Sequence, residues 1–415
     1  MLVDGVRTKL THDRMMALLA SVPNANPISE RDRRNSISSE VIRCTLNGEP
    51  AVAVGAEYSV KTKIGALLDL LDLTLADGEL PERVTVLIGN NGAPSHREAI
   101  DALCTLRDTF TGSTRIRLLT DAADGTLTEV EDGAPDFSAC ASAVSWLPEL
   151  TRLGEAPPPL IVDLISRVGH PSLRAYPDLI GWPQWSLRLE GLRVGSADAH
   201  GGWLDVGELG RFGDLSDHRL TWLTVTGAMA RIEFTADSLD TAAQVLARFA
   251  TSWTGYGTTA PDADEHTLES RILRGAVPVV VADGATLQSV RPDAVVNWGA
   301  QIPTQWGESG GTSRRFLDAL LRDGSTPWAL ELKAPAGGGV GRYYRHGIAQ
   351  AVLYRHYIRS ATPLHPLFAG QQPPLDPTAC RAALVVPRLQ PGTGWRDRHR
   401  ALASQFDVEL VEVDP

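Results

Sequence analysis

The first 150 residues alternate between strand-like and helix-like patterns of apolar positions. Polar and apolar residues alternate from Glu40 to Gly55, and the dipeptide Asn47-Gly48 inside this segment is typical of a tight hairpin turn. Helical and strand-like segments then follow in turn, over residues 62–75, 83–88, 95–110 and 115–120. This order predicts an α/β region of Rossmann-like character over residues 1–150.

A β-rich pattern occupies the middle of the chain, after a linker at Pro157-Pro158-Pro159. Aromatic residues within alternating segments predict strands over Trp185–Val194 and Arg219–Thr226. An amphipathic helix over Leu239–Trp253 ends this region. We therefore expect a second, β-rich domain over residues 151–255.

The last third of the chain opens in the order α-β-β-β-α-β. The predicted elements are a helix over 265–275, strands over 277–281, 290–297 and 328–333, a helix over 343–359, a strand over 382–386, a helix over 399–406 and a strand over 408–413. A helix over Ser313–Arg322 is predicted in the insertion before the third strand. These elements define a third domain over residues 256–415, and the whole chain belongs to the α/β class.

Composition excludes several protein classes. Apolar residues make up 43% and charged residues 21% of the 415 residues, which is typical of globular domains. No apolar stretch is long enough to span a membrane, and charges interrupt the first residues, where a signal peptide needs an apolar segment. The four cysteines are scattered, which argues against a disulfide framework or a structural zinc site. We therefore expect a cytoplasmic protein without membrane contact.

Charge is divided unevenly along the chain. Residues 1–250 contain 23 basic and 34 acidic residues and carry the whole net charge of −11, whereas residues 251–415 contain 16 of each. An acidic region is poorly suited to coat nucleic acid, so we expect the N-terminal region to bind a protein partner, form a homodimer or regulate the C-terminal domain. The same asymmetry predicts that the two halves are separable, with nucleic-acid binding confined to a fragment that begins near Ala260.

An acid and an isolated lysine share one face of the strand predicted over 328–333. Residues two apart on a strand point the same way, so Glu331 and Lys333 project together while Leu332 packs on the opposite face. Asp293, on the neighbouring predicted strand, is expected to bring a second carboxylate beside Glu331. Two carboxylates and the carbonyl of Leu332 form an oxygen-rich ligand set suited to Mg²⁺ or Mn²⁺. The ammonium of Lys333 can position an attacking water or stabilise the charge on a phosphate.

Three segments together resemble the PD-(D/E)xK nuclease superfamily: Pro292-Asp293, Glu331-Leu332-Lys333 and Gln350-Ala351-Val352-Leu353-Tyr354. The last segment is similar to the Q-x-x-x-Y helix of the RecB-like branch. The resemblance covers the C-terminal domain alone and implies a restriction-endonuclease-like αβββαβ core. It also implies Mg²⁺- or Mn²⁺-dependent cleavage of phosphodiester bonds, with DNA as the favoured substrate, in anti-phage defence, restriction or repair.

The resemblance also implies roles for individual residues. A glutamate on the first helix would complete the metal shell; Glu269 is the first candidate and Glu265, one turn earlier, is the competitor. His266 stands where some RecB-like members have a histidine ligand, although an exposed helix position explains it as well. The implied metal ligands are Asp293, Glu331, Leu332 through its carbonyl, and Glu269, and the implied catalytic residues are Asp293, Glu331, Lys333 and Gln350.

Arginines interleaved with aromatic residues occur beside and along the helix that contains Gln350, a pattern that suits contact with nucleic acid. The candidates for this contact are Tyr354, Arg342, Arg345 and Arg355. The alternative for each arginine is a position on a solvated helix surface or in the core.

Three other readings of the sequence stay open. A nuclease fold that binds nucleic acid or acts as a scaffold without cutting would keep this architecture, but the complete set of Asp293, Glu331 and Lys333 favours an enzyme. Gly307–Gly311 matches the G-x-S-x-G motif of serine hydrolases and lacks the buried strand that has to precede the serine. The loop Gly89–Gly92, at the start of a predicted helix, is either a simple turn or a phosphate-binding loop for a nucleotide signal.

Overall fold

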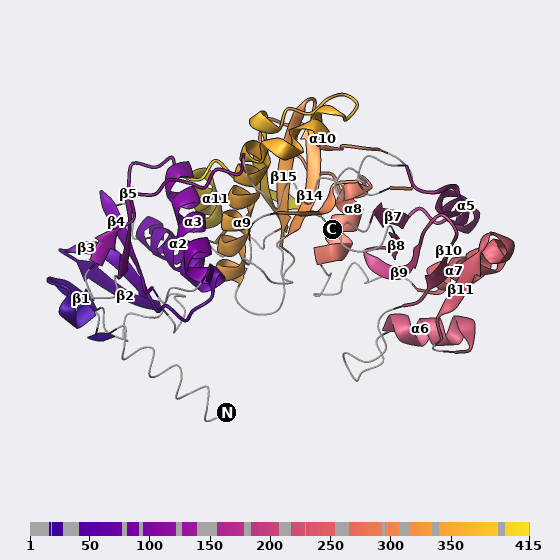
Figure 1. Cartoon of the computed structure of the whole chain (residues 1–415), viewed down its shortest axis with the longest axis horizontal. Coiled ribbons are helices and arrows are strands. Elements are labelled where there is room, and N and C mark those ends of the chain that lie inside the picture. The colour runs from indigo at the N-terminus through magenta and orange to yellow at the C-terminus, as the bar shows by residue number, and fades with distance from the viewer. Residues whose placement is uncertain are drawn as a thin grey trace.

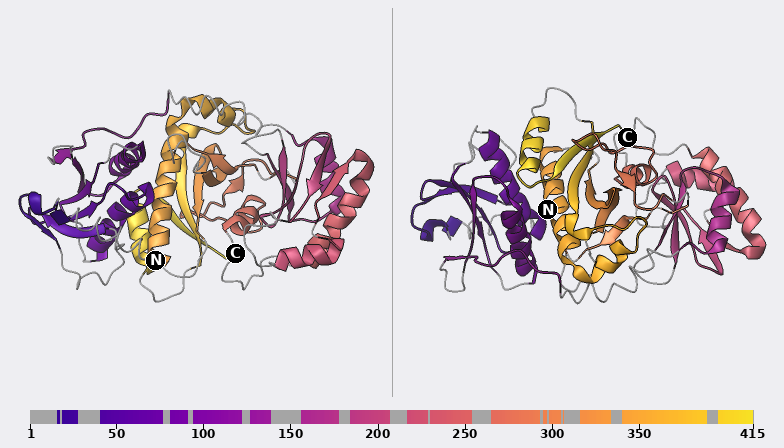
Figure 2. Two further views of the ribbon diagram at one scale, coloured as in Figure 1. Left: turned by 60° about the horizontal axis from the view of Figure 1, so that its bottom comes forward. Right: turned by 90° about the horizontal axis from the view of Figure 1, so that it is seen from above.

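The computed structural model describes residues 16–17, 19–27, 41–76, 81–90, 94–121, 127–138, 156–177, 184–206, 217–228, 230–253, 265–292, 295–296, 298–304, 306, 316–333, 340–388 and 395–414. The described strands form three sheets, which lie within residues 1–150, 151–255 and 256–415. In Figure 1 the C-terminal sheet lies between the N-terminal sheet on the left and the middle sheet on the right, and both views in Figure 2 show the same order. None of the described helices is both long enough and apolar enough to cross a membrane. The chain is a mixed α/β protein whose last part contacts the other two.

Six strands form the N-terminal sheet, in the order of the sequence. They are β1 (Ala25–Pro27), β2 (Val41–Leu46), β3 (Glu49–Val54), β4 (Arg83–Ile88), β5 (Arg115–Asp121) and β6 (Leu127–Glu129). The predicted hairpin of β2 and β3 is confirmed, since Asn47 and Gly48 have φ of 54° and 83°, the left-handed values that a type I′ turn requires. β3, β4 and β5 are parallel, and α2 (Val60–Ala76) and α3 (Pro94–Thr109) connect them.

α2 and α3 both cover one face of this sheet. Their apolar side chains share a core with Val52 and Val84, whereas Ile42 and Leu87 belong to a separate cluster on the other face. The region therefore has the β-α-β units expected of a Rossmann-like fold, with both connecting helices in a single layer.

The glycine that follows β4 has a packing role. A Cβ on Gly89 would lie 2.7 Å from the backbone nitrogen of Ala56, so no larger residue fits at this approach of two chain segments. This contact explains Gly89 without a phosphate ligand. Asn91 and Gly92 of the same loop lie outside the described residues, as does the whole Gly307–Gly311 motif.

The middle sheet is antiparallel and has the order β11-β10-β9-β8-β7. Its elements are α5 (Pro159–Val168), β7 (Leu173–Pro177), β8 (Trp185–Leu189), β9 (Leu192–Ala197), β10 (Gly201–Leu204), α6 (Asp217–Thr226), β11 (Ile232–Thr235), η3 (Ala236–Ser238) and α7 (Leu239–Ser252). The single strand predicted over Trp185–Val194 is a hairpin that turns at Glu190 and Gly191, with φ of 48° and 82°. The strand predicted over Arg219–Thr226 is wrong, because this β-branched segment is a helix whose Trp222 is buried against α7.

The C-terminal sheet has the order β12-β14-β15-β16-β17, and β13 also pairs with β14. Its elements are α8 (Glu265–Leu273), β12 (Gln288–Ser289), β13 (Ala300–Pro303), β14 (Phe316–Asp323), β15 (Thr326–Leu332), α9 (Val340–Ser360), η4 (Thr362–Leu364), α10 (His365–Ala369), η5 (Pro377–Ala379), β16 (Arg381–Pro387), α11 (Trp395–Ser404) and β17 (Glu409–Val413). β13, β14 and β15 are antiparallel, whereas β15, β16 and β17 are parallel because α9 and α11 connect them. α8 packs on one face of the sheet and α9 on the other. The strands between these helices are β12 to β15, and of the three strands predicted there only the one over 328–333 corresponds to an observed strand, β15.

Three predicted elements of this domain are wrong. The segment predicted as a strand over 277–281 contributes only an isolated bridge between Val280 and Thr286. The segment Ser313–Arg322, predicted as a helix, contains most of the central strand β14. Both faces of β14 are covered, so its apolar residues Leu317, Ala319, Leu320 and Leu321 lack the alternation of a half-exposed strand. The segment predicted as a strand over 290–297 contributes only a bridge between Val296 and Ala175 of β7 among the described residues.

α9 joins the C-terminal sheet to the N-terminal sheet. α2 and α3 pack against it, and their apolar side chains belong to the same buried cluster as those of α9. Arg345 of α9 donates from Nε to Asp69 and from Nη1 to Asp72 of α2, both at 2.7 Å, and Arg398 of α11 also binds Asp72 at 2.6 Å. Separation of the two halves would therefore expose this apolar interface and its buried carboxylates, which argues against independent folding of the halves. The confinement of nucleic-acid binding to the fragment that begins near Ala260 stays a prediction.

Candidate active site

Glu331 and Lys333 lie at the end of β15, the strand between β14 and β16. Leu332 packs in the core beneath α8, so Glu331 and Lys333 project from the opposite face, as predicted. They are only 1% and 5% exposed. The Nζ of Lys333 donates to a carboxylate oxygen of Glu331, to the carbonyl of Leu332 at 2.9 Å and to Oε1 of Glu265 at 3.4 Å. Burial of these charges is tolerable because they pair with one another.

Asp318 of β14 supplies a second buried carboxylate beside Glu331. The antiparallel register pairs Ala319 with Leu330, so one step further it sets Asp318 opposite Glu331. Oδ2 of Asp318 accepts a hydrogen bond from the backbone N–H of Leu332 at 2.9 Å. Burial raises the pKa of Asp318 well above its ordinary value of 3.8, and the charge of Glu331 raises it further. A bound cation would relieve both effects.

The place beside Glu331 that the sequence predicts for Asp293 is held by Asp318. Asp293 lies outside the described residues, and the strands that flank β15 are β14 and β16. The sequence did contain a signal for the correct partner. The dipeptide Asp323-Gly324 is typical of a hairpin, and Gly324 has φ of 56° in the turn between β14 and β15. Counting backward from this turn sets Asp318 opposite Glu331.

α8 brings two more carboxylates to the same end of the sheet. Glu269 is 2% exposed, and its charge contributes, after burial and Glu331, to the raised pKa of Asp318. Glu265, one turn earlier, has a side chain that is 31% exposed and forms an ion pair with Lys333. The Nδ1 of His266 lies 3.3 Å from Oε2 of Glu269. Both candidates for the first-helix acid therefore reach the site, Glu269 near Asp318 and Glu265 at Lys333.

The environment of Lys333 keeps its ammonium charged. Burial lowers the pKa of Lys333, but the charges of Glu331, Asp318 and Glu265 outweigh burial, and the net pKa lies above the ordinary value of 10.5. In this arrangement the lysine supplies positive charge at neutral pH. It is suited to electrostatic stabilisation of an anion rather than to removal of a proton.

The β8–β9 hairpin of the middle sheet holds α8 in place. Glu190, at the tip of the hairpin, binds Arg271 of α8 and Arg274 just after it through its carboxylate. A Cβ on Gly191 would lie 2.4 Å from the carbonyl oxygen of His266, so the turn touches the backbone of α8 directly. The middle domain thus supports the helix that carries the two glutamates of the site.

α9 covers the face of β15 that carries the charged residues. At Gly347 a Cβ would lie 3.0 Å from Cγ of Lys333, and the glycine lets the helix approach this closely. Gln350 follows one turn later, half-buried, and its Nε2 donates to the hydroxyl of Tyr354 at 3.1 Å. The predicted i, i+4 pair is confirmed. Within the described part of the chain, no direct hydrogen bond joins Gln350 to Glu331 or Lys333.

Three residues predicted to contact nucleic acid are buried: Arg345 and Tyr354 are 1% exposed and Arg355 is 2% exposed. Arg345 is held by the two aspartates of α2, and Arg355 binds Asp407 at 3.0 Å. A nucleic-acid surface made of these three residues is therefore wrong, because all three side chains are buried. The side chain of Arg342 lies outside the described residues.

The donor set of this site fits a hard divalent cation. Glu269, Asp318 and Glu331 offer the carboxylate oxygens that Mg²⁺ and Mn²⁺ prefer, and burial removes the water that would otherwise screen their mutual repulsion. No group of three His, Cys, Asp or Glu side chains among the described residues is arranged to hold a metal ion. Lys333 binds an oxygen of Glu331 and also the carbonyl of Leu332, which the sequence predicts as a ligand. A cation at this site would be held by the three carboxylates.

We expect Asp318→Asn to stabilise the metal-free protein at about pH 8, because the folded-state pKa of Asp318 lies above its unfolded value of 3.8. The folded protein keeps a proton that the unfolded chain releases. The stability that this proton contributes is present below the unfolded pKa and is lost as pH rises through the folded pKa. Asparagine keeps the acceptor for the N–H of Leu332 and removes the charge. Urea unfolding in EDTA, below the unfolded pKa of 3.8 and at about pH 8, measures the difference in stability between variant and wild type. A variant that is less stable than wild type at about pH 8 contradicts this account.

No family profile, curated protein or solved structure matches this chain, so the geometry of the site itself carries the functional argument.

Proposed function

We propose that the chain is a metal-dependent phosphodiesterase that cleaves nucleic acid, with DNA as the favoured substrate. The observation that carries this proposal is the buried cluster of Glu269, Asp318 and Glu331 beside Lys333. Three carboxylates in a buried site are costly unless they serve a cation, and a lysine within hydrogen-bond reach adds the positive charge that phosphate chemistry uses.

The topology supports the same proposal. α8, the antiparallel strands β13, β14 and β15, the crossover helix α9 and the parallel strand β16 follow one another in the order that the PD-(D/E)xK resemblance implies. The aspartate and the Glu-x-Lys segment lie on adjacent strands, β14 and β15, which is what this chemistry requires.

Each residue has a role that its position supports. A cation held by the three carboxylates would polarise a phosphate oxygen and lower the pKa of a water molecule. Lys333 is held by Glu331 and the carbonyl of Leu332, and in this proposal its ammonium would stabilise the negative charge that a phosphodiester gains in the transition state. Glu265, the more exposed acid, holds the ammonium from the α8 side.

The proposal is tested by incubating the full-length protein with plasmid, linear duplex and single-stranded DNA or RNA in Mg²⁺, Mn²⁺ or EDTA. We expect cleavage with one of the two cations and none in EDTA. Absence of cleavage with every substrate and both cations would favour the other reading of the fold, a nucleic-acid-binding or scaffolding protein that does not cut.

We expect Gln350→Ala to slow cleavage by about tenfold to a hundredfold, as the loss of an oriented polar group beside a charged site does. The residue lies one turn after the glycine that packs on Lys333, and its amide is oriented by Tyr354. The effect should fall on kcat more than on KM. Tyr354→Phe is the matched control, because it removes only the hydroxyl that orients the amide and should cost less. Equal turnover by Gln350→Ala and wild type would contradict a role in the site.

A further inference from the structure

The two faces of the middle sheet have different surroundings. On one face, Leu187 and Leu204 pack with the apolar side chains of α5 and α7 in one buried cluster. Figure 1 and both views in Figure 2 show these helices on the side of the sheet away from α8. On the other face, Tyr176 packs with Leu268 of α8. This second face is therefore turned toward the helix that carries two acids of the candidate active site.

Three arginines stand in one row across the second face. Arg174 of β7 is directly opposite Arg188 of β8, which is in turn opposite Arg193 of β9. Like charges directly opposite one another on neighbouring strands are destabilising. Among the described residues no carboxylate forms an ion pair with Arg174 or Arg188, and both donate to backbone carbonyls. An anion that lies along the row would relieve the repulsion between the three guanidinium groups.

Trp203 of β10 adds an aromatic side chain to this face. The ring is half-buried, and the guanidinium groups of Arg193 and Arg231 lie over it, 5.1 and 4.1 Å from its centroid. Both of these arginines are exposed. A guanidinium that stacks on a ring keeps its N–H donors at its edge, where they can reach a phosphate. We call Arg174, Arg188, Arg193, Trp203 and Arg231 together the arginine face.

Basic residues outnumber the described acids beside the arginine face. The acids are Glu233, which is opposite Trp203, and Asp205, whose carboxylate lies 4.0 Å from Arg231. Both acids lie at the end of the sheet formed by β10 and β11. Glu190, at the tip of the β8–β9 hairpin, is held by two arginines of the C-terminal domain. Four arginines and two acids give this surface a positive charge, although residues 1–250 as a whole are acidic.

The arginine face adjoins the candidate active site. The turn between β8 and β9 rests on α8, since a Cβ on Gly191 would lie 2.4 Å from the carbonyl oxygen of His266. Arg193 follows Gly191 by two residues, or about 7 Å along a strand. Glu265, next to His266, has a side chain that is 31% exposed and pairs with the lysine of the site. A polymer bound to the arginine face therefore lies beside the more exposed edge of the site.

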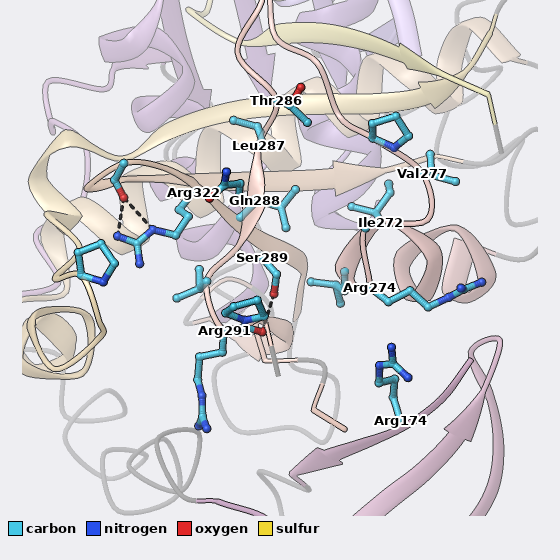
Figure 3. Close-up of a pocket in the computed structure, with 18 of the residues that line it drawn as sticks. Arg174, Ile272, Arg274, Val277, Thr286, Leu287, Gln288, Ser289, Arg291 and Arg322 are labelled. Carbon is cyan, nitrogen blue, oxygen red and sulfur yellow. Dashed lines mark hydrogen bonds between the residues drawn. The ribbon is translucent and has the colours of Figure 1, made fainter. Parts of the chain in front are cut away.

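A cavity separates β7 from the end of α8. Figure 3 shows Arg174 on β7 pointing toward α8, and the cavity between them has a volume of about 470 Å³. Ile272 and Gly275 line the opposite wall, and none of the described lining residues is acidic. An extended anionic ligand on the row of arginines thus finds space beside Arg174 as well.

We propose that the arginine face binds single-stranded nucleic acid. The row of three arginines spans two strand spacings, about 10 Å, and phosphates follow one another every ~3.4 Å along a nucleic-acid strand, so the row can contact more than one phosphate. The tryptophan ring and the guanidinium planes are surfaces for stacked bases, and an unpaired strand presents the faces of its bases. Under this proposal nucleic-acid contact is not confined to the fragment that begins near Ala260.

Delivery of the bound strand to the acids and the lysine rests on the proposed nuclease function, whereas binding does not. Fluorescence anisotropy of the full-length protein in EDTA therefore tests the binding without turnover. The probes are a labelled oligothymidylate of about 20 nucleotides, longer than one single-strand site, and a duplex of the same length. We expect the single strand to bind at least about tenfold more tightly than the duplex, because pairing hides the base faces, and to bind more weakly as salt increases.

Two variants and a matched control locate the binding. Arg188→Met keeps the aliphatic stem and removes the charge, so it should weaken binding about fivefold and reduce the slope of log affinity against log salt by about one. Trp203→Ala should weaken binding by about tenfold or more through lost stacking. Arg248→Met makes the same charge change at an exposed position of α7, on the other side of the sheet, and should alter neither the affinity nor the slope.

Thermal unfolding identifies a variant that fails to fold, and the other variant then decides. The proposal is overturned by no binding of the oligothymidylate, by binding that neither variant weakens, or by duplex binding as tight as that of the single strand. Failure of the proposed nuclease function has a different signature. A protein that binds the strand through these residues and never cuts it keeps the arginine face and loses the activity.

Discussion

Replacement of Lys333 by methionine should lower cleavage by about 10²- to 10³-fold, the loss expected when a positioned charge is removed from a phosphoryl-transfer site. Affinity for Mn²⁺ should persist or increase. The ammonium donates to Glu331 and lies in the field of Asp318, so it competes with a cation for the same carboxylates. Methionine keeps most of the aliphatic stem against Gly347 and removes the charge.

The two readouts separate a catalytic role of Lys333 from a structural one. Calorimetry with Mn²⁺ measures the affinity, and single-turnover cleavage measures the chemical step. The variant leaves the buried acids without the ammonium of Lys333, so its thermal unfolding is compared with and without Mn²⁺. We expect Mn²⁺ to stabilise the variant more than it stabilises wild type. A large fall in Mn²⁺ affinity in a folded variant would argue that the lysine organises the ligands instead.

Arg345→Ala should destabilise the protein by about 3–5 kcal/mol, the cost of removing one partner from buried ion pairs. Arg345 is 1% exposed and binds Asp69 and Asp72 across the interface between α9 and α2. Asp69 is 2% exposed and Asp72 is fully buried, so water cannot replace the guanidinium. Urea unfolding of the variant measures the loss.

The loss of stability in Arg345→Ala is compared with that in a matched variant of an exposed ion pair. Arg388 pairs with Asp414 at 2.7 Å, with both side chains largely exposed, and its replacement by alanine should cost about 1 kcal/mol or less. Adding Asp69→Asn to Arg345→Ala should recover part of the stability, since it removes a buried negative charge that has lost the guanidinium of Arg345. If Arg345→Ala unfolds with the same midpoint as Arg388→Ala, the ion pairs do not hold the two domains together.

The parts of the site that the sequence predicted are those with a local pattern. Glu331 and Lys333 alternate with leucines on a strand that ends in a turn signal, so their shared face follows from the pleat of one strand. The pair of Gln350 and Tyr354 follows in the same way from one turn of helix. Both pairs depend only on the geometry of a single strand or helix and not on the rest of the chain.

The parts that the sequence missed depend on contacts between distant segments. Asp318 lies within an apolar run that is buried on both faces, so neither alternation nor helical spacing marks its strand. Arg345 finds its partners 276 and 273 residues earlier in the chain, and a helix of arginines and tyrosines gives no sign of whether it faces solvent or another helix. One signal was present in α2. Asp69 and Asp72 are three residues apart within a run of leucines, so they lie on one face of the helix. If that face is buried, the two carboxylates require a basic side chain as partner.

The most direct test of the metal-dependent site compares three aspartate variants in cleavage and in Mn²⁺ titration. Asp318→Asn replaces the acid opposite Glu331, Asp323→Asn replaces an exposed acid on the same strand, and Asp293→Asn replaces the acid of the Pro-Asp motif. We predict that Asp318→Asn cleaves at least about a hundredfold more slowly than wild type and binds Mn²⁺ more weakly, as loss of a ligand requires, while the other two variants behave like wild type. Wild-type cleavage by Asp318→Asn, or loss of cleavage in Asp293→Asn instead, would contradict the assignment of the site to β14 and β15.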